Sequence, residues 1–182
     1  MEGRRGGAVL NAMLVQGERR RLDPETAGDH IDRLYRAACA LCGSRQLAED
    51  LVQETYVKVL ARPRFLRRDD DLGYLIKALR NTWYSHLRNE RVRREATDSG
   101  ERAPDDLQTR TSAGDPESSL EAGAVLDALA ELPQPYREAV AAVDVAGLSY
   151  AEAARALGVR QGTIMSRLYR GREQVAQAVG QA

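Results

Sequence analysis

The stretch "LSYAEAARALGVRQGTIMSRLYRGR", Leu148–Arg172, holds two short helical patterns around one glycine and ends in a group of arginines. Ser149 and Glu152 have the spacing of a capping box, in which the serine side chain accepts from the backbone N–H of residue 152 and the glutamate reaches back. Gly158 supplies a left-handed turn. The aliphatic positions that begin with Ile164 then place a second helix across the first. The spacing predicts a helix-turn-helix.

The second helix of this unit is expected to present polar and basic side chains on its outer face. Such a helix fits the major groove of DNA, where an arginine can pair with a guanine edge and further arginines hold phosphates. The simpler alternative is a basic, solvated pair of helices, because many protein helices end in arginine. The outward-facing residues are Met165, Ser166, Arg167, Tyr169, Arg170 and Arg172.

The composition of the 182-residue chain favours helices, because 43% of the residues are hydrophobic but only 5% are aromatic. The net charge is zero, yet the charges are separated along the chain. Lysine and arginine outnumber acidic residues ten to four over 62–94 and five to one over 155–182, whereas acidic residues prevail thirteen to three over 95–154. Two basic segments, suited to phosphate backbones, therefore flank an acidic one. The alternative is that these charges only solvate helix faces.

The N-terminal half of the chain contains three helical patterns. An apolar repeat over 31–41 stops at Gly43, and a second apolar stripe covers 47–60 with acidic and polar residues on the opposite face. After a break at Pro63, a charged loop leads to a third and longer pattern over 72–87. We expect one face of this third helix to dock on the first two helices and the other face to carry the basic residues.

Residues 95–119 contain almost no large apolar side chain, so burial cannot offset the entropy of ordering them. Further helical patterns begin near Leu120. The sequence therefore predicts an all-α fold with two small helical domains joined by a flexible linker. The expected boundaries are a mobile N-terminal extension at 1–28, a first domain at 29–95, an acidic linker at 96–119 and a second domain at 120–182.

Several classes of protein are disfavoured by the sequence. No apolar run approaches the length of about 18 residues that a membrane span needs, and the N-terminal stretch is too interrupted for a signal peptide, so we expect a cytoplasmic protein without membrane insertion. Cys39 and Cys42 have the spacing of metal and redox sites, but His30 and His86 are the only histidines and no second such pair exists. We interpret both cysteines as ordinary helix residues and expect no metal or other cofactor, with a redox role or adventitious metal binding as the alternatives.

Four stretches carry a resemblance to a known family: "AEDLVQETYVKVL" (Ala48–Leu60), "LGYLIKALRNTWYSHLRNERVRR" (Leu72–Arg94), "ELPQPYREAV" (Glu131–Val140) and "DVAGLSYAEAARALGVRQGTIMSRLYRGR" (Asp144–Arg172). In this order, with a spacer between the second and third, they resemble bacterial RNA polymerase sigma factors of the extracytoplasmic-function (ECF) group. Sigma factors of this group have only regions 2 and 4 of the sigma-70 family. The resemblance covers most of the chain beyond residue 28.

The resemblance implies contacts with core RNA polymerase. Asp50, Gln53 and Glu54 match the family's surface that binds the clamp helices of the largest subunit. Region 4 is correspondingly expected at the flap of the second-largest subunit. The alternative for these three residues is a solvated helix face, which explains their charges but not their place among the other matches.

The resemblance also implies two contacts with promoter DNA. The minus-10 element would be bound and opened by Lys77, Arg80, Asn81, Tyr84, Arg88 and Arg91, with a preceding loop that captures a flipped base and holds Phe65, Arg67 and Arg68. Trp83 lies on the apolar stripe, and we expect it in the core. The minus-35 element would face Arg160, Thr163, Met165, Ser166, Arg167, Tyr169, Arg170 and Arg172, with Arg167 and Arg172 on phosphates.

Two departures from the family pattern limit what the resemblance implies. Arg160 stands where the family often has proline, so its role does not follow from the family pattern. Leu72 and Gly73 replace residues that are usually larger, polar or aromatic, so the preferred minus-10 sequence cannot be transferred.

The sequence thus predicts a promoter-specificity subunit that directs core polymerase to a two-part promoter and performs no chemistry itself. The resemblance further implies an anti-sigma protein as a partner. One alternative is an autonomous regulator that binds a palindromic operator as a dimer through its helix-turn-helix. Another is a redox enzyme that uses Cys39 and Cys42, although no nucleophile-base pair or phosphate-binding glycine loop accompanies them.

Overall fold

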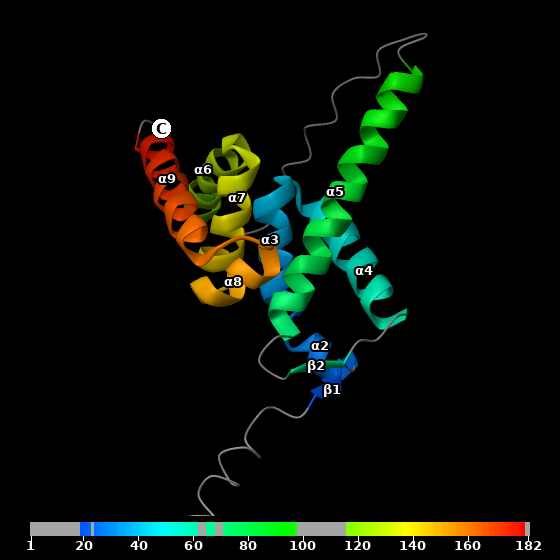
Figure 1. Cartoon of the computed structure of the whole chain (residues 1–182). Coiled ribbons are helices and arrows are strands. Elements are labelled where there is room, and N and C mark those ends of the chain that lie inside the picture. Colours follow the sequence, from blue (N-terminus) through cyan, green and yellow to red (C-terminus); the bar gives the residue numbers. More distant parts are fainter. Residues whose placement is uncertain (1–18, 23, 62–64, 68–70, 98–115, 181–182) are drawn as a thin grey trace, which may run out of the picture.

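The structure, a computed structural model of the chain, describes residues 19–22, 24–61, 65–67, 71–97 and 116–180. The described residues form helices, as the sequence predicts, together with two strands of three residues each (Figure 1). In chain order the elements are β1 (Arg19–Arg21), α2 (Pro24–Gly28), α3 (Ile31–Cys42), α4 (Arg45–Ala61), β2 (Phe65–Arg67), α5 (Asp71–Thr97), α6 (Pro116–Glu131), α7 (Gln134–Val140), the π-helix η2 (Ala141–Val145), α8 (Tyr150–Leu157) and α9 (Gln161–Val179).

The N-terminal bundle, which consists of α2 to α5, is built around α3. This helix ends at Gly43, whose positive φ of 71° suits glycine and whose N–H donates to the carbonyl of Cys39 at 2.8 Å. The Oγ atom of Ser44 accepts from the backbone N–H of Leu47 at 3.3 Å at the start of α4. The predicted end of the first helix and start of the second are therefore confirmed. The buried side chains of α3, α4 and α5 include Leu34, Leu51, Leu75, Leu79 and Trp83.

Residues 19–22 and 24–28 pack with this bundle, which corrects that part of the predicted mobile extension at 1–28. β1 pairs antiparallel with β2, and Leu22 and Ala27 are buried in the core. The hydroxyl of Tyr56 donates to the carbonyl of Ala27 at 2.7 Å. A three-residue strand and a five-residue helix are too short to produce a periodic pattern, so the sequence did not reveal them. The rest of the predicted extension lies outside the described residues.

The C-terminal bundle, which consists of α6 to α9, contains the predicted helix-turn-helix. Ser149 accepts from the backbone N–H of Glu152 at 3.3 Å and donates its own N–H to the Glu152 carboxylate at 2.7 Å, so the capping box is complete. Gly158 ends α8 with a φ of 69°. α9 lies close against α7 at Gly171, where a Cβ atom would approach a methyl carbon of Val140 to 2.9 Å. A larger residue at this position would push the two helices apart.

Both ends of the predicted linker are helical. α5 continues to Thr97 and α6 begins at Pro116, so residues 96–97 and 116–119 extend the helices on either side. The remaining part of the predicted linker, 98–115, lies outside the described residues.

The two bundles share one hydrophobic core. α3 packs against α4 and α5 and also against α6 and η2, while α5 packs against α8. Figure 1 shows α3 in the middle of the molecule, with α4 and α5 on one side and the C-terminal bundle on the other. Buried apolar side chains form a continuous cluster through both bundles. The predicted domains therefore lie against each other in this structure.

Candidate nucleic-acid and polymerase interface

The recognition helix of the helix-turn-helix, α9, presents an open face. Met165 and Tyr169 lie four residues apart and are 53% and 70% exposed, which is unusual for large apolar side chains. Ser166 is exposed between them and its hydroxyl donates to the carbonyl of Thr163 at 3.0 Å. Arg160 is exposed at the N-cap position of the helix. The structure thus places these predicted minus-35 residues along one accessible helix.

The arginines of α9 differ in their partners. Arg172 forms a two-pronged ion pair with Asp144 of η2, with its Nε 2.9 Å from one carboxylate oxygen. This hydrogen bonding raises the pKa of Arg172 further above its ordinary value. Arg170 is exposed and donates to the hydroxyl of Tyr136 at 3.2 Å, and Arg167 is half-buried. Arg172 therefore fastens α9 to η2, and its predicted phosphate contact would require this ion pair to open.

The predicted polymerase-binding residues lie together on α4. Asp50, Gln53 and Glu54 are all exposed and occupy positions i, i+3 and i+4, which share one face of a helix. The Glu54 carboxylate pairs with the ammonium group of Lys58 at 2.6 Å. The surface available to a partner is therefore acidic at one end and carries a cation at the other.

The predicted minus-10 residues of α5 fall into two groups. Lys77, Asn81, Arg88 and Arg91 are exposed, and Arg91 pairs with Glu95 of the next helical turn at 2.8 Å. Arg80 and Tyr84 are instead half-buried beneath the C-terminal bundle. The side chains of Phe65 and Arg67, and all of Arg68, lie outside what the structure describes.

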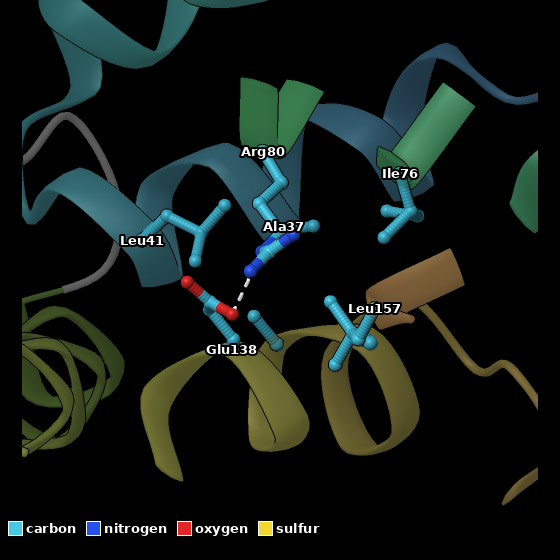
Figure 2. A pocket seen from close by; sticks show the side chains of 8 residues that line it. Ala37, Leu41, Ile76, Arg80, Glu138 and Leu157 are labelled. Atoms are coloured by element: carbon cyan, nitrogen blue, oxygen red, sulfur yellow. Dashed lines mark hydrogen bonds and ion pairs between the residues drawn. The ribbon is translucent and has the colours of Figure 1, made fainter. Parts of the chain in front are cut away.

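Glu138 of α7 covers the second group. Its carboxylate accepts from the Nε of Arg80 at 2.8 Å, and Figure 2 shows this pair. It also accepts from the hydroxyl of Tyr84 and from the side-chain amide of Gln134, the latter at 3.3 Å. The Arg80 guanidinium lies 4.8 Å from the centre of the Tyr84 ring. Burial and the Glu138 carboxylate raise the pKa of the Tyr84 hydroxyl, which keeps it a donor.

Glu138 is a residue that the sequence did not reveal as part of the site. The side chain is 3% exposed and lies next to the buried residues Ala139 and Val140, so it is an acidic residue within an apolar helix segment. A buried carboxylate requires a cationic or donor partner, which is a signal that the sequence contained. The sequence did not reveal which cation that partner was, because Arg80 is 58 residues away.

Two further arginines join the bundles through backbone carbonyls. Arg33 of α3 donates from Nε to Ala146 at 2.7 Å and from Nη2 to Gly147 at 3.0 Å. Gly147 has a φ of 76°, and a Cβ atom there would lie 2.9 Å from the Arg33 guanidinium, so only glycine fits. Arg137 of α7 donates from Nη1 to the carbonyl of Leu41 at 3.0 Å. These bonds satisfy carbonyls near the ends of η2 and α3.

The cysteines have the character of packed helix residues. Cys39 is buried, and burial raises the pKa of its thiol. Burial also raises the pKa of the Cys42 thiol to about 11, and this thiol donates to the carbonyl of Ser44 at 3.2 Å. Both groups are therefore thiols rather than reactive thiolates near neutral pH. Trp83 is buried as expected, with His86 stacked on it at 5.7 Å between ring centres.

Two absences hold within the part of the chain that the structure describes. No group of three His, Cys, Asp or Glu residues there could hold a metal ion. No helix there combines the length and apolarity needed to traverse a lipid bilayer.

Comparison with known families identifies both bundles. The family model of sigma-70 region 2 matches residues 27–93, and that of sigma-70 region 4 matches residues 122–175. The chain is 37% identical over 179 residues to the ECF RNA polymerase sigma factor SigE of Mycolicibacterium smegmatis, covering 93% of this chain and 66% of the relative. It is 35% identical over 149 residues to the ECF RNA polymerase sigma factor EcfG of Rhodopseudomonas palustris, covering 80% and 78%.

The fold matches a solved sigma factor. The sigma factor RpoE of Bartonella quintana, solved in complex with the anti-sigma factor NepR, superposes with a TM-score of 0.65 at 25% identity, over 86% of this chain and 95% of RpoE. The chain belongs to the ECF group of RNA polymerase sigma factors in the sigma-70 family. It spans 66% of SigE and 54% of a second relative, the ECF RNA polymerase sigma factor BldN of Streptomyces coelicolor. Sigma factors are regulatory rather than catalytic proteins.

Proposed function

We propose that this protein is a promoter-specificity subunit of RNA polymerase, which binds the core enzyme in the cytoplasm and directs it to a promoter with minus-10 and minus-35 elements. The observation that carries the proposal is the presence of regions 2 and 4 in the family's order in one chain, each with its candidate DNA-reading residues on a single helix. The protein performs no chemistry of its own and requires no cofactor. Specific initiation arises from positioning two modules on one polymerase.

Region 4 reads the minus-35 element as duplex through α9. Met165 and Tyr169 supply apolar surface that suits thymine methyl groups, while Arg170 has the exposed guanidinium needed to bind a guanine edge. Arg167 and Arg160 supply positive charge for phosphates of the duplex. Ser166 and Thr163 complete the same surface.

Region 2 holds the melted minus-10 strand along α5. Lys77, Arg80 and Arg88 provide positive charge for the strand's backbone, and Asn81 and Tyr84 provide hydrogen-bonding groups. The loop with Phe65, Arg67 and Arg68, together with Arg91, extends this surface. Binding of each module alone is weak, because the benefit of linking them arises only when both elements are reached together.

Two protein partners follow from the family. Asp50, Gln53 and Glu54 on α4 bind the clamp helices of the polymerase's largest subunit, and region 4 binds the flap of the second-largest subunit. The similarity to RpoE, which was solved with an anti-sigma factor, supports an anti-sigma protein as a regulator of this chain as well. Such an inhibitor would cover the same surfaces.

The test is run-off transcription with purified core polymerase and a library of genomic promoters. We expect initiation at specific promoters only when this protein is added. Initiation that is absent, or no more selective than with core polymerase alone, would contradict the proposal. Footprinting of a palindromic operator by the protein alone would instead favour the autonomous dimeric regulator, for which the open face of α9 is suitable.

A charge reversal tests the polymerase contact. Asp50→Lys should weaken the affinity for core polymerase about tenfold, roughly 1.4 kcal/mol, because it reverses the charge of a residue in the proposed acidic contact surface. Glu49→Lys is the matched control, since Glu49 is the exposed acidic neighbour outside the predicted set. Equal loss in both variants, measured by binding of labelled protein to core polymerase, would argue against the specific assignment.

A further inference from the structure

We propose that Arg80 and Tyr84 form a single oxyanion site for which two groups compete: the Glu138 carboxylate of region 4 in the free chain, and a backbone phosphate of the minus-10 single strand in the promoter complex. The inference rests on the proposed function of region 2. It adds that region 4 masks the DNA site of region 2 through a carboxylate that takes the place of a phosphate.

The two donors of this site converge from one helix. Arg80 and Tyr84 lie four residues apart on α5, and the Arg80 Nη2 lies 3.4 Å from the Tyr84 hydroxyl oxygen. Both side chains direct donors at the same carboxylate. The Arg80 Nε lies 2.8 Å from a Glu138 carboxylate oxygen, a contact drawn in Figure 2. Guanidinium and hydroxyl donors suit the oxygens of a carboxylate and of a phosphodiester equally well. A phosphate can therefore replace Glu138 without any change in the donors.

Glu138 and DNA cannot occupy the site formed by Arg80 and Tyr84 at the same time. Glu138 is 3% exposed, and the buried side chains of Leu41 and Ile76 in the N-terminal bundle and of Leu157 in α8 line the narrow contact around it, which leaves only a small hollow. A nucleic-acid strand cannot enter this contact while the bundles are closed. When they separate, Glu138 is hydrated rather than left buried without a partner, so opening avoids the largest cost of breaking a buried ion pair.

The other contacts between the two bundles determine what fraction of the free chain has its bundles separated. Arg33 and Arg137 hold the bundles together through backbone carbonyls, and neither is among the residues proposed to contact DNA or polymerase. The eighteen residues between α5 and α6 have a contour length of roughly 60 Å, so region 4 can leave the face of α5 without either bundle unfolding. Weakening a carbonyl contact should therefore open the chain with the oxyanion site intact.

The experiment measures binding of the full-length free protein to a fluorescent 12-nucleotide single-stranded DNA of randomised sequence. Glu138→Gln should bind this probe about tenfold more tightly than the wild type, because the apparent affinity rises as the competent fraction increases. Loss of one negative charge alone would also favour DNA, so Glu131→Gln, an exposed position on α6, is the matched control. The proposal requires Glu138→Gln to exceed Glu131→Gln by several-fold, and equal binding by the two variants would overturn it.

Arg33→Gln provides a second test with the opposite electrostatic sign. Removing a positive charge weakens DNA binding if only net charge matters, whereas opening the interface strengthens it. We expect at least a threefold gain in affinity for the single-stranded probe. A loss of affinity would overturn the proposal. Circular dichroism checks that each variant retains its helices.

A distance measurement reports the opening itself. Spin labels at Val57 of α4 and Gln177 of α9, both exposed, should show a longer and broader distance distribution in Glu138→Gln and Arg33→Gln than in the wild type. Unchanged distances together with tighter DNA binding would overturn the competition. If both variants open and bind DNA as expected but run-off transcription shows no selectivity, the oxyanion site stands and the proposed promoter function fails.

Discussion

The two helices proposed to read DNA, α5 and α9, differ in how much of their reading face the folded chain leaves open. On α9, Met165 and Tyr169 are exposed to solvent, and Arg170 donates to a tyrosine hydroxyl of its own bundle. On α5, Arg80 and Tyr84 are bound to Glu138 of the other bundle. Accessibility is thus set by how the bundles pack, and a helix with suitable residues is not sufficient. The free chain can present its helix-turn-helix while Arg80 and Tyr84, two residues of the proposed strand-binding face, stay covered.

The largest expected effect tests whether the C-terminal bundle, which covers Arg80 and Tyr84, unfolds together with the N-terminal bundle. Leu168→Ala removes a fully buried side chain of region 4 and should lower the free energy of unfolding by about 2 to 5 kcal/mol. Trp83, the single tryptophan, reports only on region 2. Because the core is continuous, urea unfolding followed by Trp83 fluorescence should shift to lower urea in this region 4 variant.

The control for this experiment is Met165→Ala, one helical turn away and exposed, which should change stability by no more than about 0.5 kcal/mol. If Leu168→Ala shifts the circular dichroism transition but leaves the Trp83 transition in place, the bundles unfold independently. The covered state of α5 would then be too weak to mask a DNA site.

The second-largest effect concerns the exposed face of α9 and its binding to DNA. Arg170→Ala should cost about 1 to 3 kcal/mol of binding to a minus-35 duplex and relax the preference at one base pair, if the side chain makes a two-pronged base contact. Arg167→Ala should weaken binding evenly across sequences and reduce the salt slope by about one, as a phosphate contact would. Arg172→Ala should act mainly on stability, because its guanidinium holds Asp144.

These three variants are compared by fluorescence anisotropy with core polymerase present, at several salt concentrations. An unchanged minus-35 preference in Arg170→Ala would remove this residue from base reading. The salt slope is the slope of log affinity against log salt concentration. If this slope falls as much for Arg172→Ala as for Arg167→Ala, the ion pair between Arg172 and Asp144 opens on DNA.

The third effect lies in α8, which packs on α5 and also leads into α9. Ser149→Ala deletes one half of the capping box and should lower the free energy of unfolding by about 0.5 to 2 kcal/mol at neutral pH. Gly171→Ala is a useful comparison, because it strains the contact of α9 with α7 and leaves the cap intact. Urea titrations give both values.

The cap also predicts a dependence on pH. Hydrogen bonds with the side chain and backbone of Ser149 lower the pKa of the Glu152 carboxyl below its usual value. A lowered pKa in the folded state means that the stabilisation is present above the unfolded pKa, about 4.3, and is lost as the pH falls through the lower folded pKa. The stability difference between wild type and Glu152→Gln should therefore shrink as the pH is lowered below about 4. A difference that is constant down to pH 3 would contradict this assignment.

The smallest effect is expected at the two cysteines of α3. Because burial raises the pKa of Cys42 to about 11, only a small fraction of its thiol is ionised at pH 8. Alkylation of the folded protein should therefore be much slower than that of the protein unfolded in guanidinium. Replacing Cys39 and Cys42 by serine should leave run-off transcription intact, and loss of transcription with folding preserved would revive a redox role.

Local signals in the sequence predicted the helix-turn-helix and the exposed helix faces. Ser149, Glu152 and Gly158 fix the ends of α8 through contacts that span a few residues, and the apolar spacing then sets which side of α9 is buried. The acidic face of α4 follows in the same way, because residues three and four positions apart share a helix face. Each of these features is decided within about twenty residues of chain.

The contacts that cover Arg80 and Tyr84 on α5 could not be predicted by the same reasoning. The contact between Arg80 and Glu138 joins residues 58 apart, and the segment between them contains no periodic signal that specifies how the bundles meet. The ion pair of Arg172 with Asp144, which lies 28 residues away, was not predicted either, and the phosphate contact of Arg172 stays a prediction. Leu22 and Ala27 were assigned to a mobile segment because isolated apolar residues show no period. In each case the missing information was a tertiary contact.

The π-helix η2 gives the molecule a rotational offset that an unbroken α-helix would lack. A π-turn accommodates an additional residue, so the chain after α7 is turned relative to the direction it would otherwise follow. In this register Asp144 meets α9, while the carbonyls of Ala146 and Gly147 meet Arg33 on α3. The five residues of η2 thereby couple the orientation of α9 to the packing of the C-terminal bundle on α3. Inserting or deleting a residue in η2 would disturb both contacts together.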